Sequence, residues 1–352
     1  MCTTNFSLSL KALSLCFFCF ANFACRPSPT TTSLPKPAFY HWKTQLSLSL
    51  AEHNYLNSLG VEKLYVKFFD VDWDEAAGQP APLATVELDT TRLGYLQIIP
   101  TIFITNRCLL NLPMPAVDTL ASRILLKVKS LAPSPPSELQ FDCDWTPQTQ
   151  AKYFGLLNSV KKLSLLDSPF TISATIRLHQ LKYFEKTGVP PVDRGMLMCY
   201  NMGNLDDWAT DNSLLDPVTL ETYLQPQQDY PLPLDLALPL YRWGVLFRDG
   251  RLVKLLNGLT ELDLQDTTRF ERTAPQRFEV KKSTYLQAHY LYAGDQIRLE
   301  AATPEAVEEA ANLLATLRSE TPATVAFYHL DSTIIQAFPK EKIQKTLSVW
   351  VR

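Results

Sequence analysis

The chain has 352 residues, of which 46% are hydrophobic and 20% charged, and its formal net charge is −3. A chain of this length can hold one large domain or two small ones. The slightly acidic balance gives no support to nucleic-acid binding or to general adhesion to anionic membranes, so no nucleic-acid partner is expected. Glycine is scarce, at 11 residues, and no glycine-rich phosphate-binding pattern occurs.

Residues 1–25 are predicted to be a signal peptide. Lys11 precedes an apolar run over residues 12–21, which is too short to remain as a membrane-spanning helix. The run leads to Cys25 after a small residue, which resembles a bacterial lipobox with Cys25 as the lipidated residue. Asn22 stands where Leu is usual, so simple cleavage without lipidation is the alternative. We therefore expect an exported protein, anchored in the periplasm or outer membrane through Cys25.

Eight apolar segments predict β-strands, and most of them are followed by a helical pattern. The strands cover residues 38–44, 63–74, 98–105, 138–146, 170–178, 195–201, 235–241 and 323–330. The helices cover residues 49–59, 116–131, 148–163, 217–223, 304–317 and 340–349. A proline-containing loop and a short helix are expected after residue 74, and residues 246–252 predict a hairpin.

Strands that are buried on both faces and alternate with helices indicate a parallel sheet. Eight such units favour a (β/α)8 TIM barrel over an open doubly wound sheet. After a flexible tether at residues 26–37, the barrel domain would cover residues 38–352. Residues 243–300 would form a long insertion between strand seven and strand eight, because they exceed a simple connection. Polar residues gather at the carboxyl ends of the strands, where barrel sites form.

Two pairs of acids end the second and fourth predicted strands. They are Asp70 with Asp72, and Asp142 with Asp144. Alternation puts both members of a pair on one face, where they repel unless water, hydrogen bonds or a ligand compensate. Such carboxylates are candidates for a catalytic acid, base or nucleophile. The alternative is that they are solvated strand ends or form salt bridges with Arg177 and Lys43.

Other polar and aromatic residues near strand ends are candidates for substrate binding. They are His41, Arg177, His179, Tyr200, Asn201, Tyr241 and His329. The histidines could act as acids or bases near neutral pH, or be hydrogen-bonded structural residues. No short His-x-His or His-Glu-x-x-His spacing occurs, so neither a metal nor another cofactor is expected.

The remaining residues of interest are aromatic residues, which could bind a sugar, and three cysteines. The aromatic residues near presumed loops are Trp42, Trp73, Trp145, Trp208, Tyr241 and Trp243. Some would pack in the core, but sugar-binding clefts use flat aromatic faces in the same way. Cys108, Cys143 and Cys199 lie in apolar settings and are interpreted as buried thiols.

Three segments, in chain order, resemble motifs of glycoside hydrolase family 18, the chitinase-like barrels. Residues 138–146 resemble the fourth strand, with its pattern Asp-Gly-x-Asp-x-Asp-x-Glu. Residues 196–201 resemble the sixth-strand Met-x-Tyr-Asp, and residues 238–241 resemble the seventh-strand Leu-Pro-x-Tyr. The resemblance covers the barrel loosely from residue 38 to residue 330. The whole chain also resembles a group of exported barrel lipoproteins of Bacteroidetes type.

The resemblance implies roles for individual residues. Asp142 and Asp144 match the last two aspartates of the motif, which orient the substrate amide and tune the acid. The residues that match substrate-contacting positions are Tyr200, Asn201 and Tyr241. Thr146 stands where the family has the Glu that protonates the leaving oxygen. Loss of a general acid typically removes ~10²–10⁴-fold of rate, so the family mechanism does not transfer whole.

Three functions remain open, all in the cell envelope. The first is a glycoside hydrolase acting on a polysaccharide or oligosaccharide, with Asp144 as acid and Asp142 as its partner. Asp70 and Asp72 would then be the opposing carboxylates, unless His179 or His329 is the proton donor. The second is a glycan-binding lipoprotein that has lost the family acid. The third is an interaction or assembly protein that uses the barrel as a scaffold, which a mouth blocked by residues 243–300 would favour.

Overall fold

The computed structural model describes residues 34–163, 168–226, 229–318 and 320–351. In this part of the chain, eight strands pair in parallel, and β1 pairs with both β18 and β3, which closes the sheet into a barrel. The barrel strands are β1 (Lys36–His41), β3 (Lys63–Asp74), β6 (Gln97–Ile104), β7 (Glu138–Asp142), β8 (Thr171–Arg177), β9 (Arg194–Met198), β10 (Leu234–Pro239) and β18 (Thr324–Tyr328). The predicted (β/α)8 barrel is confirmed.

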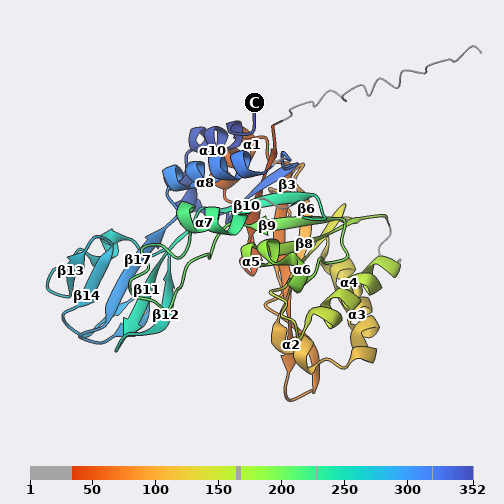
Figure 1. Ribbon diagram of the computed structural model, residues 1–352, viewed down its shortest axis with the longest axis horizontal. Helices are drawn as coiled ribbons and strands as arrows, with labels where there is room; N and C mark the ends of the chain where they lie inside the picture. Colours follow the sequence, from red (N-terminus) through yellow and green to blue (C-terminus); the bar gives the residue numbers. More distant parts are fainter. Residues whose placement is uncertain (1–33, 164–167, 227–228, 319, 352) are drawn as a thin grey trace, which may run out of the picture. The chain divides into compact units, whose positions relative to one another are not determined.

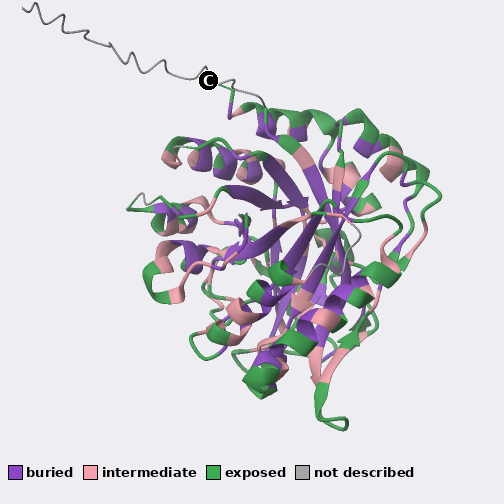
Figure 2. Cartoon of the chain, turned by 90° about the vertical axis from the view of Figure 1, so that its right-hand side faces the viewer, coloured by how far each residue is buried: buried purple, intermediate pink, exposed green. Residues whose placement is uncertain are grey.

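Helices surround the barrel strands and bury their apolar faces against them (Figures 1 and 2). The helices are α1 (Leu50–Ser58), α2 (Asn106–Asn111), α3 (Val117–Leu131), α4 (Gln150–Lys162), α5 (Leu178–Lys182), α6 (Phe184–Thr187), α7 (Pro217–Leu224), α8 (Pro304–Leu317), α9 (Ser332–Ala337) and α10 (Lys340–Ser348), with 3₁₀ turns η1 (Met114–Ala116) and η2 (Glu261–Leu264). In α8, Thr303 caps the amino end and Pro304 occupies the first turn. No helix in the described residues is long and apolar enough to cross a bilayer.

The barrel interior is polar at its amino end and aromatic toward its carboxyl end. At the amino end, the buried Glu138 accepts hydrogen bonds from Lys63 at 2.8 Å and from Ser173 at 2.7 Å. Arg194 pairs there with the buried Asp235 at 2.7 Å. Because these ion pairs lie away from the mouth of the barrel, we assign them to stability.

A separate antiparallel sheet lies in the chain between β10 and α8. Its strands are β11 (Arg242–Arg248), β12 (Arg251–Asn257), β13 (Phe270–Ala274), β14 (Arg277–Val280) and β17 (Gln296–Ala301), in the order β12-β11-β17-β14-β13. Strands β15 (Thr284–Leu286) and β16 (His289–Leu291) form a hairpin beside it. One face of the sheet forms its own apolar cluster, whereas Val245 and Phe247 on the other face of β11 join the barrel core.

Buried charge ties this sheet to the loop that follows β9. Arg298 and Glu300 of β17 form an ion pair at 2.7 Å, and both side chains are fully buried. Arg298 donates to the Leu205 carbonyl at 3.3 Å. Glu300 accepts hydrogen bonds from the Ser213 hydroxyl at 2.5 Å and from the Trp243 indole at 2.9 Å. Since every charged group in this network has a partner, the sheet and the loop are held in one arrangement.

The short helix predicted after residue 74 is wrong. That segment forms β4 (Gln79–Leu83), which pairs antiparallel with the end of β3, while β5 (Glu87–Leu88) pairs with β2 (Gln45–Leu46). The Asp74 carboxylate accepts hydrogen bonds from the Ala76 and Ala77 amides, and Gly78 takes φ +61°. This turn chemistry returns the chain as a strand. The predicted signal peptide and Cys25 lie outside the described residues.

Candidate functional site

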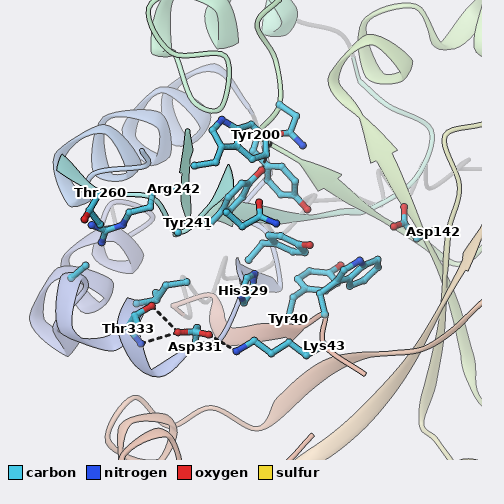
Figure 3. A pocket seen from close by; sticks show the side chains of 18 of the residues that line it. Tyr40, Lys43, Asp142, Tyr200, Tyr241, Arg242, Thr260, His329, Asp331 and Thr333 are labelled. Atoms are coloured by element: carbon cyan, nitrogen blue, oxygen red, sulfur yellow. Dashed lines mark hydrogen bonds and ion pairs between the residues drawn. The ribbon is translucent and has the colours of Figure 1, made fainter. Parts of the chain in front are cut away.

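A cavity of about 1140 Å³ lies at the carboxyl ends of the barrel strands (Figure 3). The barrel contributes Tyr40, Trp42, Lys43, Phe103, Asp142, Asp144, Arg177, Tyr200, Asn201, Tyr241, Tyr328 and His329 to its lining. The segment after β10 contributes Arg242, Trp243, Asn257, Gly258, Thr260 and Gln287, and residues around α9 complete it. In Figure 3, Asp142 lies at one side of the cavity, and Arg242 and Thr260 lie at the other.

Aromatic rings form the central wall of the cavity. Tyr328 stands among them, with its ring centre 5.3 Å from Tyr200, 5.4 Å from Tyr241 and 5.8 Å from Trp42. Trp243 extends the wall, 5.2 Å from Tyr241. Rings at these spacings support one another in stacked and edge-on arrangements. The wall is therefore fixed before any ligand arrives.

Asp142 is a buried carboxyl that faces into the cavity. Its side chain accepts a hydrogen bond from the Thr175 hydroxyl at 2.7 Å, and the residue is 5% exposed. Burial raises the pKa of Asp142, the neighbouring Arg177 opposes that rise, and the charge of Asp144 adds to it. Asp142 thus holds a proton more readily than an ordinary aspartate.

Asp144 lies closer to solvent and is paired with Arg177. The guanidinium of Arg177 engages both carboxylate oxygens, with Nη2 at 3.2 Å from Oδ2. Burial by itself lowers the pKa of Arg177, but the charges of Asp142 and Asp144 raise it above its usual value. Both oxygens of Asp144 therefore accept hydrogen bonds from one cation.

A second charged pair, Lys43 with Asp331, lies across the cavity from Asp142 (Figure 3). Asp331 also caps α9 by accepting from the Thr333 amide at 2.8 Å. Burial raises the pKa of Asp331, but hydrogen bonds from Lys43 and Thr333 outweigh it and lower that pKa well below its usual value. Burial, with Lys43 nearby, lowers the pKa of His329 to about 4. His329 is therefore neutral at pH 7.

The structure brings together most of the residues predicted for the site. Those that line the cavity are Asp142, Asp144, Arg177, Tyr200, Asn201, Tyr241 and His329. Asn201 adopts a positive φ of 55°, which asparagine tolerates, and its side-chain Oδ1 accepts a hydrogen bond from the Tyr241 hydroxyl at 2.7 Å. These two substrate-binding candidates therefore hold each other in place.

Four predicted residues do not line this cavity. Asp70 pairs with Lys67 at 3.0 Å, and Asp72 is engaged by Arg107 and by the Thr105 hydroxyl at 2.6 Å. The Arg107 hydrogen bonds lower the pKa of Asp72 to about 2, although partial burial opposes them. The second acid pair therefore does not face the first across the mouth.

The two remaining residues are histidines. The ring of His41 lies 2.9 Å from the Gln45 carbonyl and lines a smaller cavity of about 490 Å³. His179 was predicted at the end of a strand but lies in α5, where it is exposed. It follows Arg177 by two residues and is not among the residues that line the cavity.

Thr146, at the position that matches the family acid, is turned toward α4. Its amide donates to the Thr149 hydroxyl at 2.8 Å, and the two hydroxyls lie 3.3 Å apart. Thr149 in turn donates to the side chain of Asn106 at 2.7 Å. Thr146 is not among the residues that line the cavity, so it supports the start of the helix.

Sequence reasoning did not name Tyr40 and Tyr328 as site residues. Strand alternation contained a signal for the first, because Ala38, Tyr40 and Trp42 share one face of β1 and all point into the barrel. The described residues contain no group of three or more His, Cys, Asp or Glu side chains suited to a metal ion.

No protein-family model and no curated protein matches this chain. Solved structures do resemble it. The Bacillus cereus spore cortex-lytic enzyme SleL aligns with TM-score 0.54 at 15% identity, over 89% of this chain and 75% of that one. A chitinase from Chromobacterium violaceum aligns with TM-score 0.53 at 10% identity, over 89% and 99%.

A third similar structure is described as a glycoside hydrolase family 18 N-acetylglucosaminidase from Paenibacillus barengoltzii. It aligns with TM-score 0.50 at 12% identity, over 90% of this chain and 98% of that one. At such identities the similarity establishes the fold alone. The barrel therefore has the architecture found in glycoside hydrolase family 18 structures.

Proposed function

We propose that this protein binds a carbohydrate chain in the cavity at the mouth of the barrel. The observation that carries the proposal is the aromatic wall around Tyr328, whose rings pack on the barrel core on one side and line the cavity on the other. Sugar rings present apolar C–H faces to flat aromatic rings and hydroxyls to polar groups at the edge. Asp142, Arg177 and Asn201 supply those polar groups.

Binding is favoured over family-type hydrolysis because the required carboxylates are missing or occupied. Thr146 has no acid function and faces α4. Asp144 accepts both of its hydrogen bonds from Arg177, while Asp70 and Asp72 are engaged by other cations outside the cavity. Hydrolysis with two carboxylates needs a pair that faces the ligand from opposite sides, at about 5–9.5 Å from each other.

Glycoside hydrolysis remains a second candidate, on the strength of one residue. Asp142 has a raised pKa because it is buried, and it faces the cavity, as a proton donor should. Its partner would have to be Asp331, which is held by Lys43. Release of new reducing ends from N-acetylglucosamine oligomers, lost in Asp142→Asn, would favour hydrolysis over binding.

The scaffold alternative depends on a blocked mouth. The segment after β10 instead contributes Asn257, Thr260 and Gln287 to the wall of an open cavity. This supports a ligand site. Export and anchoring through Cys25 are part of the proposal, since a surface anchor would hold the cavity at the cell envelope. Metabolic palmitate labelling that disappears in Cys25→Ser is the expected result; labelling retained in that variant would contradict it.

The test of carbohydrate binding uses the soluble N-acetylglucosamine tetramer, a probe suggested by the names of the similar structures. Calorimetry should detect binding by the full chain, and Trp42→Ala should weaken it roughly tenfold because a face of the aromatic wall is lost. Trp73→Ala is the matched control, since that tryptophan lies on β3 outside the cavity. Absence of binding, or equal effects of the two variants, would overturn the proposal.

A further inference from the structure

The hairpin of β15 and β16 carries three exposed tyrosines on one face. Tyr285 and Tyr290 lie directly opposite each other in the ladder, and Tyr292 follows on the same face. Their exposed fractions are 67%, 46% and 51%. The ring centres are 5.1 Å apart for the first pair and 5.0 Å apart for Tyr290 and Tyr292. We call these three residues the tyrosine face.

The tyrosine face is rigidly supported. Leu286 and Leu291 on the opposite side of the hairpin are buried in the apolar cluster of the antiparallel sheet. The Arg248 guanidinium lies 4.3 Å from the centre of the Tyr292 ring, and Asp295 holds it with hydrogen bonds of 2.7 and 2.8 Å. The rings are thus ordered without a ligand, which lowers the entropic cost of binding.

The tyrosine face continues from the cavity. The hairpin turn consists of Gln287 and Ala288, both at positive φ, and Gln287 lines the cavity. Each strand of the hairpin is three residues long, so the tyrosines begin within about 10 Å of the cavity wall. A chain that fills the cavity and leaves it over this turn would run onto the tyrosine face.

The chemistry of the face suits a carbohydrate chain. The three residues offer flat apolar rings that each end in a hydroxyl, so they can contact both the C–H faces and the hydroxyls of sugar rings. A soluble protein rarely leaves contiguous aromatic surface uncovered without a binding role. Tyrosine supplies such contact area with few rotatable bonds.

We propose that the tyrosine face is a second carbohydrate-binding surface, occupied by the part of a polysaccharide that extends beyond the cavity. The inference rests on the proposed function and sharpens it, because it makes a polymer, rather than a short oligosaccharide, the ligand. A short oligosaccharide fills only the cavity. A polymer engages the cavity and the tyrosine face together, and the linked contacts multiply its affinity.

The experiment compares the soluble N-acetylglucosamine tetramer with insoluble chitin as probes of the full chain. The variant replaces all three tyrosines, Tyr285→Ala, Tyr290→Ala and Tyr292→Ala; each is solvent-exposed, so the fold should persist, which circular dichroism checks. Affinity for the tetramer should stay within about twofold, and affinity for chitin should fall roughly tenfold. Tyr95→Ala is the matched control, because Tyr95 is 55% exposed and precedes the amino end of β6.

Three outcomes would overturn the inference. If the triple variant binds chitin as well as the wild-type chain does, the tyrosine face has no part in binding. If it loses tetramer and chitin binding equally, the hairpin belongs to the cavity and is no second surface. If it instead dissociates a dimer in sedimentation, the face binds another copy of the chain. Loss of binding in Trp42→Ala alone would keep the proposed function while this inference falls. A wild-type chain that binds neither probe removes both.

Discussion

The ends of β3 and β7 carry the same sequence feature, an Asp-x-Asp pair, and put it to different uses. At β7, Asp142 enters the cavity as a buried carboxyl, and Asp144 meets Arg177 at the rim. At β3, Asp70 pairs with Lys67 from its own strand, and Asp72 pairs with Arg107 from α2. The cations nearby, rather than the acids themselves, decide which pair can meet a ligand.

The backbone of β3 departs from regular alternation just before its acid pair. In the ladder with β6, Lys67 pairs with Thr101 but Phe69 pairs with Ile102, so Phe68 is an extra residue. This bulge buries Phe68 and Phe69 together on the outer side and changes the alternation for every residue that follows. Beyond it, Asp70 is in register with Phe103 of β6, which is in register with Asp142 of β7. Asp70 therefore turns to the same inner side as Asp142, and Lys67 holds it there.

The largest expected difference between the two acid pairs is in the free energy of unfolding, when the cation that pairs with each is removed. Arg177→Ala leaves the buried Asp142 beside Asp144 without a counter-charge, so we expect a loss of about 3 kcal/mol in the free energy of unfolding at pH 7. Arg107→Ala should cost far less, because its side chain is 55% exposed. Urea denaturation of both variants measures this contrast. Equal losses would mean that the two acid pairs are equivalent.

The fold was predictable because the barrel strands are buried on both faces and each is followed by a helix or a polar loop. β10 and β9 show this in their apolar runs. The β7 site was predictable for the same reason: regular alternation places Asp142 inward. The bulge at Phe68, which turns Asp70 to the inner side, was not predictable, since no local residue pattern marks it. Arg177 was named from the sequence as a possible salt-bridge partner and does pair with Asp144. Arg107 was not, because its pairing with Asp72 depends on where α2 packs beside β3, which is a tertiary property.

The two acid pairs should also differ in how their contribution to the free energy of unfolding changes with pH. The pKa of Asp72 is lowered to about 2, so its stabilisation is present above an unfolded-state pKa near 4 and is lost as pH falls toward 2. Asp72→Asn should therefore lose at most about 1 kcal/mol at pH 7 after solvent screening, and progressively less as pH falls toward 2. Thermal unfolding across pH 2–7 measures the difference.

Asp142 should change stability with pH in the opposite direction to Asp72. Its folded-state pKa is raised by burial, so its favourable contribution is complete below pH 4 and is lost as pH rises through that pKa. Asp142→Asn removes the cost of ionisation, and the variant should therefore gain stability relative to the wild-type chain between pH 4 and pH 7. Parallel stability curves for Asp142→Asn and the wild-type chain would contradict the raised pKa.

Substitutions in the two acid pairs should differ less in their effect on ligand affinity than in their effect on stability. Asp142→Asn keeps the shape of the cavity but changes a buried polar group that faces the ligand, so we expect roughly fivefold weaker binding of the N-acetylglucosamine tetramer. Asp70→Asn lies outside the lining and should change that affinity by less than about twofold. Calorimetry at one pH measures both. A larger effect from Asp70→Asn would place β3 in the site after all.

The smallest expected effect concerns the residue at which the chain departs from the family pattern. Thr146→Glu restores the acid to the sequence motif, yet we expect no hydrolysis of N-acetylglucosamine oligomers. Thr146 faces Thr149 at the start of α4, and its side chain does not line the cavity. A glutamate there would meet the helix amides and the Asn106 side chain that Thr149 now engages, instead of a leaving oxygen.

Reducing-end release by Thr146→Glu, compared with Thr146→Gln as the uncharged control, decides this last point. No release from either variant means that the backbone after β7, and not the missing acid alone, separates this barrel from hydrolysis. Release from the Glu variant only would mean that the loop can turn residue 146 inward. In that case the end of β7 would have the backbone geometry for hydrolysis and would lack only the acidic side chain at residue 146. The acids at the end of β3 would still be held in their salt bridges.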